Sequence, residues 1–178
     1  MDHKTQTLFD GADANLAKLI TELSQQDPAI LAKKPAPDAW SVLEVMEHLR
    51  LAESFAMAYI KKKLSFNPTL PASNWQSRLR SFLLDLTLRL PIKRKAPKGV
   101  NVDNIKLDKD FATLAKEWQD QRTELRAFLM ELPSELYSKQ VYKHPFGGRM
   151  SLAGMLSFYN THFDRHSKQI QRTLAKVT

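Results

Sequence analysis

Residues 151–174, SLAGMLSFYNTHFDRHSKQIQRTL, contain the pattern that decides the fold class. Apolar residues recur every three or four positions along this stretch, which is the spacing of one face of an α-helix. They are Leu152, Met155, Leu156, Tyr159, Phe163, Ile170 and Leu174. Ser151 stands just before them, and its hydroxyl suits the capping position of a first helical turn. The stretch therefore predicts one long amphipathic helix with its apolar side toward a core.

Three further stretches have the same periodicity. The first ends before Pro28, because proline cannot continue a helix. The second begins at Ser41, where Glu44 three residues later completes a capping box, and it should end near Lys63. The third runs from about residue 108 to residue 132. Strand signals are scarce, so we predict an all-α protein.

The connection between the second and third long helices is unusually long. Four prolines interrupt residues 65–108, and only Trp75 to Leu90 has helical spacing. A simple up-down-up-down arrangement would need only short loops. We therefore predict a four-helix bundle of another topology, with a long crossover that contains a short extra helix. Residues 1–178 are expected to form a single domain.

Composition removes several classes of site. The chain has no cysteine, which excludes disulfide scaffolds, thiolate-zinc sites and cysteine nucleophiles. Its longest apolar stretch, residues 81–90, is interrupted by Asp85 and Arg89 and is far shorter than the roughly 20 residues that span a bilayer. The first residues do not resemble a signal peptide. We expect a cytoplasmic protein with no membrane segment.

Positive charge is concentrated in one region. Residues 61–98 contain ten Lys and Arg against one acid, so this segment has a charge of +9 within a chain of formal net charge +8. It could contact nucleic acid or a membrane, or attract a small anionic substrate. A solvated linker beside a charged helix face is the favoured interpretation, and we expect no nucleic-acid partner.

Two histidines in the opening stretch are candidate metal ligands. His162 and His166 are four residues apart and so share one side of the helix, on its apolar arc. Zincin proteases require HExxH, but Phe163 occupies the glutamate position, which argues against that class. A third ligand could come from His48, at the edge of the apolar face of the second helix. The alternative for His48 is a core-edge histidine bonded to the backbone or to Glu44.

His144 is a separate case. It precedes Pro145 in a glycine-containing loop, so helical periodicity says nothing about its direction. It could be a ligand, although shaping the loop or lining a pocket is the favoured role.

Three motifs resemble the DinB-like superfamily of DinB/YfiT-type metalloenzymes. They are DAWSVLEVMEHLRLAE at 38–53, HPFGGRMSLAGMLSFYNTH at 144–162 and HFDRHSKQIQR at 162–172. The resemblance implies an up-down-down-up four-helix bundle and a divalent metal held by His48, His162 and His166. It also implies a small-molecule substrate, since some members are S-transferases that use low-molecular-weight thiols, and a homodimer, since members often dimerise. Residues 65–105 match little of the family.

Such a ligand set has a recognisable chemistry. Three neutral imidazoles leave an open coordination position, as in catalytic rather than structural zinc sites. Zinc or nickel suits imidazole best, while iron, cobalt and manganese remain open. The second-shell candidates are Glu44, Glu47 and Asp164. We therefore expect a metal-dependent thiol S-transferase or hydrolase, with no catalytic acid or base assigned. The alternative is a non-enzymatic protein whose residues 61–98 bind nucleic acid or an anionic partner.

Overall fold

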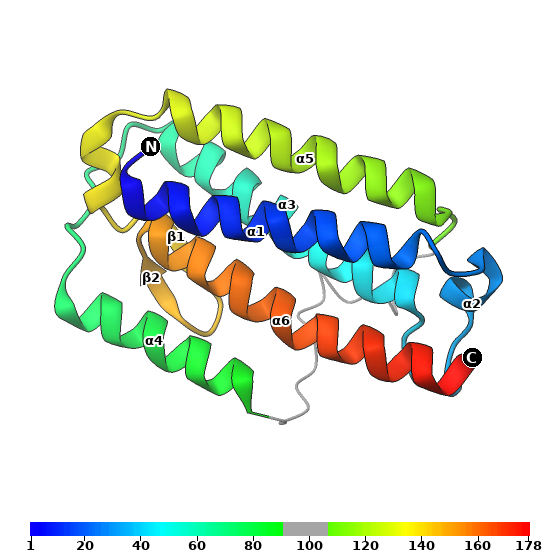
Figure 1. Ribbon diagram of the computed structural model, residues 1–178. Coiled ribbons are helices and arrows are strands. Elements are labelled where there is room, and N and C mark those ends of the chain that lie inside the picture. Colours follow the sequence, from blue (N-terminus) through cyan, green and yellow to red (C-terminus); the bar gives the residue numbers. More distant parts are fainter. Residues whose placement is uncertain (91–106) are drawn as a thin grey trace.

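Four long helices form the body of the molecule. The computed structural model describes residues 1–90 and 107–178. The helices are α1 (His3–Leu23), α3 (Val42–Leu64), α5 (Phe111–Glu131) and α6 (Leu152–Val177). In Figure 1, α1 and α6 run in one direction while α3 and α5 run in the other, which is the up-down-down-up order. The prediction of an all-α four-helix bundle is confirmed.

Each long helix begins at a side-chain cap. The side chains of Asp2, Ser41, Asp110 and Ser151 each accept a hydrogen bond from a backbone N–H in the first turn. At Ser41 the carboxylate of Glu44 also accepts from the Ser41 N–H at 2.7 Å, so the predicted capping box is present. Caps of this kind stabilise a helix by about 1 kcal/mol each. Local sequence therefore fixes where these helices start.

The crossover contains the predicted extra helix, α4 (Trp75–Arg89), capped by Asn74. Figure 1 shows α4 lying alongside α6 at the edge of the bundle. The guanidinium of Arg165 on α6 donates to the carbonyl oxygens of Leu88 and Leu90, which fastens the end of α4 to α6. Four basic residues of the positively charged segment lie outside the described residues: Lys93, Arg94, Lys95 and Lys98.

Three small elements were not predicted. A short helix α2 (Pro28–Ala32) begins at the proline that ends the first helix, because proline is well suited to a first helical turn. A 3-10 helix η3 (Ser134–Ser138) follows α5. The loop before α6 is an antiparallel hairpin of β1 (Tyr142–His144) and β2 (Gly148–Met150). Residues 145–147 form its turn, and Gly148, where β2 begins, has a positive φ of +67°.

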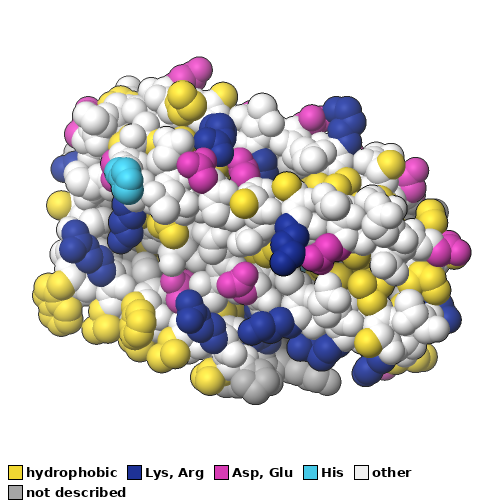
Figure 2. Space-filling model, viewed as in Figure 1, with side chains coloured by type: hydrophobic (Ala, Val, Ile, Leu, Met, Phe, Trp, Pro, Cys, Tyr) yellow, Lys and Arg dark blue, Asp and Glu magenta, His cyan; other side chains and the backbone are white. Residues whose placement is uncertain are grey.

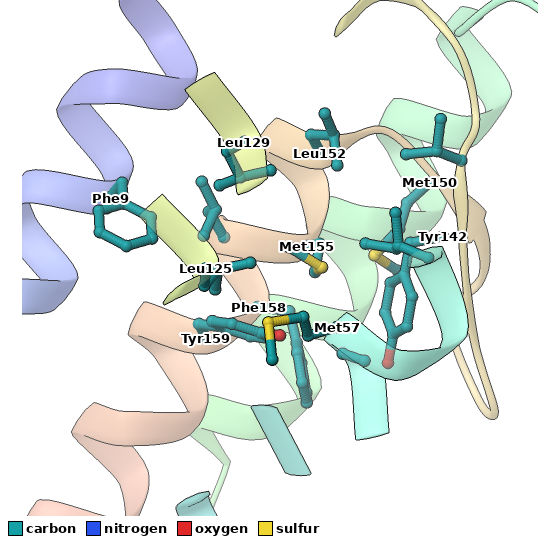
Figure 3. Close-up of a cluster of buried hydrophobic side chains, with 14 of the residues drawn as sticks. Phe9, Met57, Leu125, Leu129, Tyr142, Met150, Leu152, Met155, Phe158 and Tyr159 are labelled. Carbon is teal, nitrogen blue, oxygen red and sulfur yellow. The ribbon is translucent and has the colours of Figure 1, made fainter. Parts of the chain in front are cut away.

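Two groups of buried apolar side chains fill the bundle. In Figure 3 one of them joins α1, α3, α5, α6 and the hairpin. The second lies among α1, α2, α3, α5 and α6, and it includes Trp118 and Phe163. None of the helices within residues 1–90 and 107–178 has both the length and the apolar character needed to cross a membrane.

A buried ion pair links α3 and α5 between these groups. The Arg122 guanidinium donates to both carboxylate oxygens of Glu53, at 2.5 and 2.6 Å, and Trp118 Nε1 donates to the same carboxylate at 2.9 Å. Both charged side chains are almost fully buried. Burial acts to lower the pKa of Arg122, but the Glu53 carboxylate outweighs it and raises this pKa, so the guanidinium stays charged.

Candidate metal centre

Three histidines from two helices converge at one point in the bundle. His48 lies on α3, and His162 and His166 lie one turn apart on α6. One ring nitrogen from each lies within 4.8 Å of the others. The Nε2 atoms of His48 and His162 are 3.3 Å apart. The structure thus brings together the three residues proposed from the sequence.

The surroundings of His162 and His166 disfavour the charged form of their rings. His48 and His166 are buried, whereas His162 is partly exposed. Burial lowers the pKa of His166 to about 3, and the neighbouring His48 acts in the same direction. Burial and then His166 and His48 lower the pKa of His162 well below 6.5. His162 and His166 are therefore neutral at pH 7, and a neutral imidazole is the form that binds a metal.

Gln169 fixes the orientation of His166. The His166 Nδ1 lies 2.9 Å from the Gln169 Oε1, which can only accept a hydrogen bond. The ring proton is therefore on Nδ1, and the lone pair on Nε2 remains free for a cation. Outer acceptors of this kind orient metal-binding histidines. Sequence reasoning missed Gln169, although its position three residues after His166 on a helix was a usable signal.

The three carboxylates considered from the sequence have other surroundings. Glu44 belongs to the capping box and pairs with Lys34 at 2.8 Å. Glu47 pairs with Arg50 at 2.7 Å, and Asp164 is exposed. The acceptor at His166 is thus an uncharged amide.

His144 is buried at the end of β1 beside this cluster. Its Nδ1 accepts hydrogen bonds from the backbone N–H groups of Phe146 at 3.2 Å and Gly147 at 3.0 Å. The neutral ring must then have its proton on Nε2, which leaves no lone pair for a metal. Burial lowers the pKa of His144 to about 4. The structure therefore gives His144 a loop-shaping role.

Aromatic rings border the three histidines. Phe158 stacks on His162 with ring centroids 5.0 Å apart and an interplanar angle of 16°. The His144 ring lies 4.4 Å from Phe158 on the hairpin side, and Trp40 lies 5.0 Å from His48. Tyr159 instead belongs to the core, where its hydroxyl donates to the Glu53 carbonyl at 3.1 Å. Aromatic rings therefore form part of the wall around the cluster.

The spacing of the ring nitrogens fits a metal. Two ligands placed 2.0–2.1 Å from a tetrahedral ion lie roughly 3.3–3.4 Å from each other. The His48 and His162 Nε2 atoms have this separation, 3.3 Å. This pair of nitrogens therefore fits a divalent cation, and a ring nitrogen of His166 lies within 4.8 Å of both.

Comparison with known proteins places the chain in a family. The DinB superfamily model matches residues 8–170. The chain belongs to the DinB superfamily. The chain is also 24% identical over 168 residues to the uncharacterized protein YuaE of Bacillus subtilis, an alignment that covers 92% of this chain and 96% of YuaE. The family resemblance inferred from the three motifs is confirmed.

A solved four-helix-bundle structure is also similar. YfiT from Bacillus subtilis matches with a TM-score of 0.61 and 15% identity, over 97% of this chain and 87% of YfiT. It is described as a probable metal-dependent hydrolase with an unusual four-helix bundle topology. At this identity the likeness establishes the shared DinB-type fold.

Proposed function

We propose that this DinB-superfamily protein is a metal-dependent enzyme whose centre is a divalent cation held by His48, His162 and His166. The observation that carries the proposal is the convergence of three ring nitrogens within 4.8 Å. The neutral state of His162 and His166 and the 3.3 Å separation of two Nε2 atoms support it. The description of YfiT as a probable metal-dependent hydrolase points the same way.

The chain's own residues hold the ligands ready. Gln169 keeps the Nε2 lone pair of His166 directed away from its Nδ1 contact, and Phe158 stacks on the ring of His162. Two ligands on one helix and a third on its neighbour leave room for an open position. A bound divalent cation, with zinc or nickel best suited to imidazole, would supply a Lewis acid at that position.

The proposed substrate is a small molecule with an apolar portion. Trp40 and Phe158 supply apolar surface beside the histidines, and the Nε2–H of His144 is a hydrogen-bond donor on the same side as Phe158. Hydrolysis and thiol S-transfer both suit this site. In the second case the low-molecular-weight thiol must arrive as a substrate, because the chain has no cysteine.

A panel of reactions on metal-loaded protein tests this function. Ester and amide hydrolysis would be assayed beside conjugation of low-molecular-weight thiols to electrophiles, with wild type, His162→Ala and His3→Ala. His3 lies at the start of α1, far in sequence from the cluster, and serves as the histidine control. We expect wild type to catalyse at least one of these reactions. His162→Ala should abolish that activity, and His3→Ala should keep it. Equal turnover in all three proteins would contradict the assignment.

The non-enzymatic alternative has less support. Lys61, the first residue of the basic segment, forms an ion pair with Glu124 at 2.5 Å, which partly neutralises its charge. The homodimer implied by the resemblance is not required by the metal site, because one chain supplies all three histidines.

A further inference from the structure

Helix α4 presents its apolar side to solvent. Six large apolar residues share one arc of the helix and its C-cap, and each is 44 to 70% exposed. They are Trp75, Leu79, Phe82, Leu83, Leu86 and Leu90. Figure 2 shows hydrophobic side chains gathered along the lower left edge, where Figure 1 places α4. We call these six residues the α4 stripe.

The opposite side of α4 fixes this orientation. Ser77 and Leu84 are buried there. A Cβ on Gly154 of α6 would lie only 3.1 Å from the Ser81 hydroxyl oxygen, so the two helices approach closely. The Ser157 hydroxyl donates to the Asp85 carboxylate at 2.6 Å. Together with the Arg165 hydrogen bonds, these contacts prevent α4 from turning its stripe toward the bundle.

The stripe is large for an uncovered surface. With ordinary side-chain areas, the exposed parts of the six residues amount to roughly 600 Å² per molecule, at the upper end of the largest apolar patch on a typical monomer. Two such surfaces would bury on the order of 1,200 Å² in total, which reaches the lower limit of specific protein interfaces. A second copy of the chain is therefore a sufficient partner.

We propose that the α4 stripe is a homodimer interface in which two α4 helices pair antiparallel across a two-fold axis between Phe82 and Leu83. The stripe residues are placed symmetrically along the helix on either side of this point. In an antiparallel pair, Trp75 of one copy would therefore lie opposite Leu90 of the other, Leu79 opposite Leu86, and Phe82 opposite Leu83. A two-fold interface requires such self-complementarity. This inference is independent of the metal centre.

The charged edges of the stripe predict how its association should respond to salt. Arg78, Arg80 and Arg89 flank the stripe and are exposed. In a homodimer these like charges repel one another, and salt screens the repulsion, so added salt should tighten the dimer. An anionic lipid surface would attract the same arginines, and its binding would weaken with salt.

Sedimentation equilibrium at low and high salt tests the association. We expect a dimer in the micromolar range that tightens as sodium chloride is raised. Phe82→Glu should weaken it at least 100-fold, because each copy places the charge at the centre of the interface. The matched control is Met130→Glu, which changes a 63% exposed residue on α5 and should leave the dimer intact. A wild-type monomer at 100 µM, or equal weakening by both variants, would overturn the proposal. So would binding to anionic vesicles by a protein that stays monomeric.

Disulfide cross-linking tests the register of the two helices. The chain has no native cysteine, so only the introduced cysteines can form a disulfide. Leu83→Cys lies beside the proposed axis and should form a disulfide between copies under mild oxidation. Two copies of Trp75→Cys would stand about 22 Å apart along the helices, well beyond the reach of a disulfide. That variant should cross-link only with Leu90→Cys when the two proteins are mixed. Ready cross-linking of Trp75→Cys with itself would contradict the antiparallel register.

Discussion

The Nε2 atoms of His48 and His162 lie 3.3 Å apart, although 114 positions separate the two residues in the chain. The antiparallel packing of α3 against α6 produces this approach. Two imidazole nitrogens at this distance either share a single proton or direct their lone pairs toward one cation. The second arrangement explains why a third histidine faces the same point.

Loss of the Gln169 amide should weaken metal binding without unfolding the protein. Gln169→Leu removes the acceptor for His166 Nδ1, so the ring is free to turn and to change its tautomer. Removing such an outer partner typically costs 10- to 100-fold in metal affinity. Competition with a chromophoric chelator would measure the change. Gln171→Leu, an exposed glutamine on the same helix, should have no effect, and equal losses in both variants would count against the role of Gln169.

The buried pair of Glu53 and Arg122 should respond asymmetrically to mutation. Arg122→Met leaves the Glu53 carboxylate buried with Trp118 as its remaining strong donor in this network, which should lower the free energy of unfolding by about 3–5 kcal/mol. Adding Glu53→Leu removes the unpaired charge and should restore much of this loss. Urea denaturation of both single variants and the double variant would measure the coupling. Additive losses would show that the pair does not act as a unit.

Acid should destabilise the metal-free protein over a defined range. The pKa of His144 is about 4 in the folded protein against 6.5 for an ordinary histidine, so between these values the unfolded chain binds the extra proton. The contribution of His144 to the free energy of unfolding is fully present above pH 6.5. It falls as pH decreases toward 4, by at most about 3 kcal/mol. His162 and His166 act in the same direction.

His144→Asn isolates the contribution of His144. An Asn side-chain oxygen can still accept from the loop N–H groups, but it does not titrate. The variant should show a shallower fall in unfolding free energy between pH 6.5 and 4, measured by urea denaturation in the presence of a chelator. An unchanged slope would contradict the buried neutral state of His144.

Arg165 should stabilise the last turn of α4. Its guanidinium bonds to the carbonyl oxygens of Leu88 and Leu90, so Arg165→Met should increase amide hydrogen exchange there by on the order of 10-fold. Lys168→Met, an exposed residue on the same helix, is the control. Protection that is equal in both variants would argue against this tether.

Much of the architecture could be predicted because it depends on local signals. The capping box of Ser41 and Glu44 and the periodicity of residues 151–174 specify helices directly. The hairpin was missed because strands of three residues are too short to show alternation. For α4 the pattern predicted the helix but not which of its faces contacts the bundle. The face with the small residues Ser77 and Ser81 packs against α6, and the apolar face is exposed.

The candidate site was partly predictable for a similar reason. Helical spacing placed His162 and His166 on one side and His48 at the edge of the apolar face of its own helix, and the family resemblance then implied all three as ligands. Gln169 was missed because uncharged amides are common on helix surfaces, although its position three residues after His166 placed it within reach of that ring. The sequence also did not reveal the pair of Glu53 and Arg122, because charged residues are expected at the surface unless a partner in space is known. The single domain over residues 1–178 and the cytoplasmic location stay predictions.

Metal stoichiometry tests the central claim most directly. Protein stripped with a chelator and reloaded with zinc or nickel would be analysed for bound metal, with His48→Ala, His162→Ala and His166→Ala compared with His144→Asn. We predict about one ion per chain in wild type and His144→Asn, with nitrogen ligands near 2.0–2.1 Å by X-ray absorption, and loss of tight binding in each alanine variant. Full metal content in the combined triple-alanine protein would contradict the account.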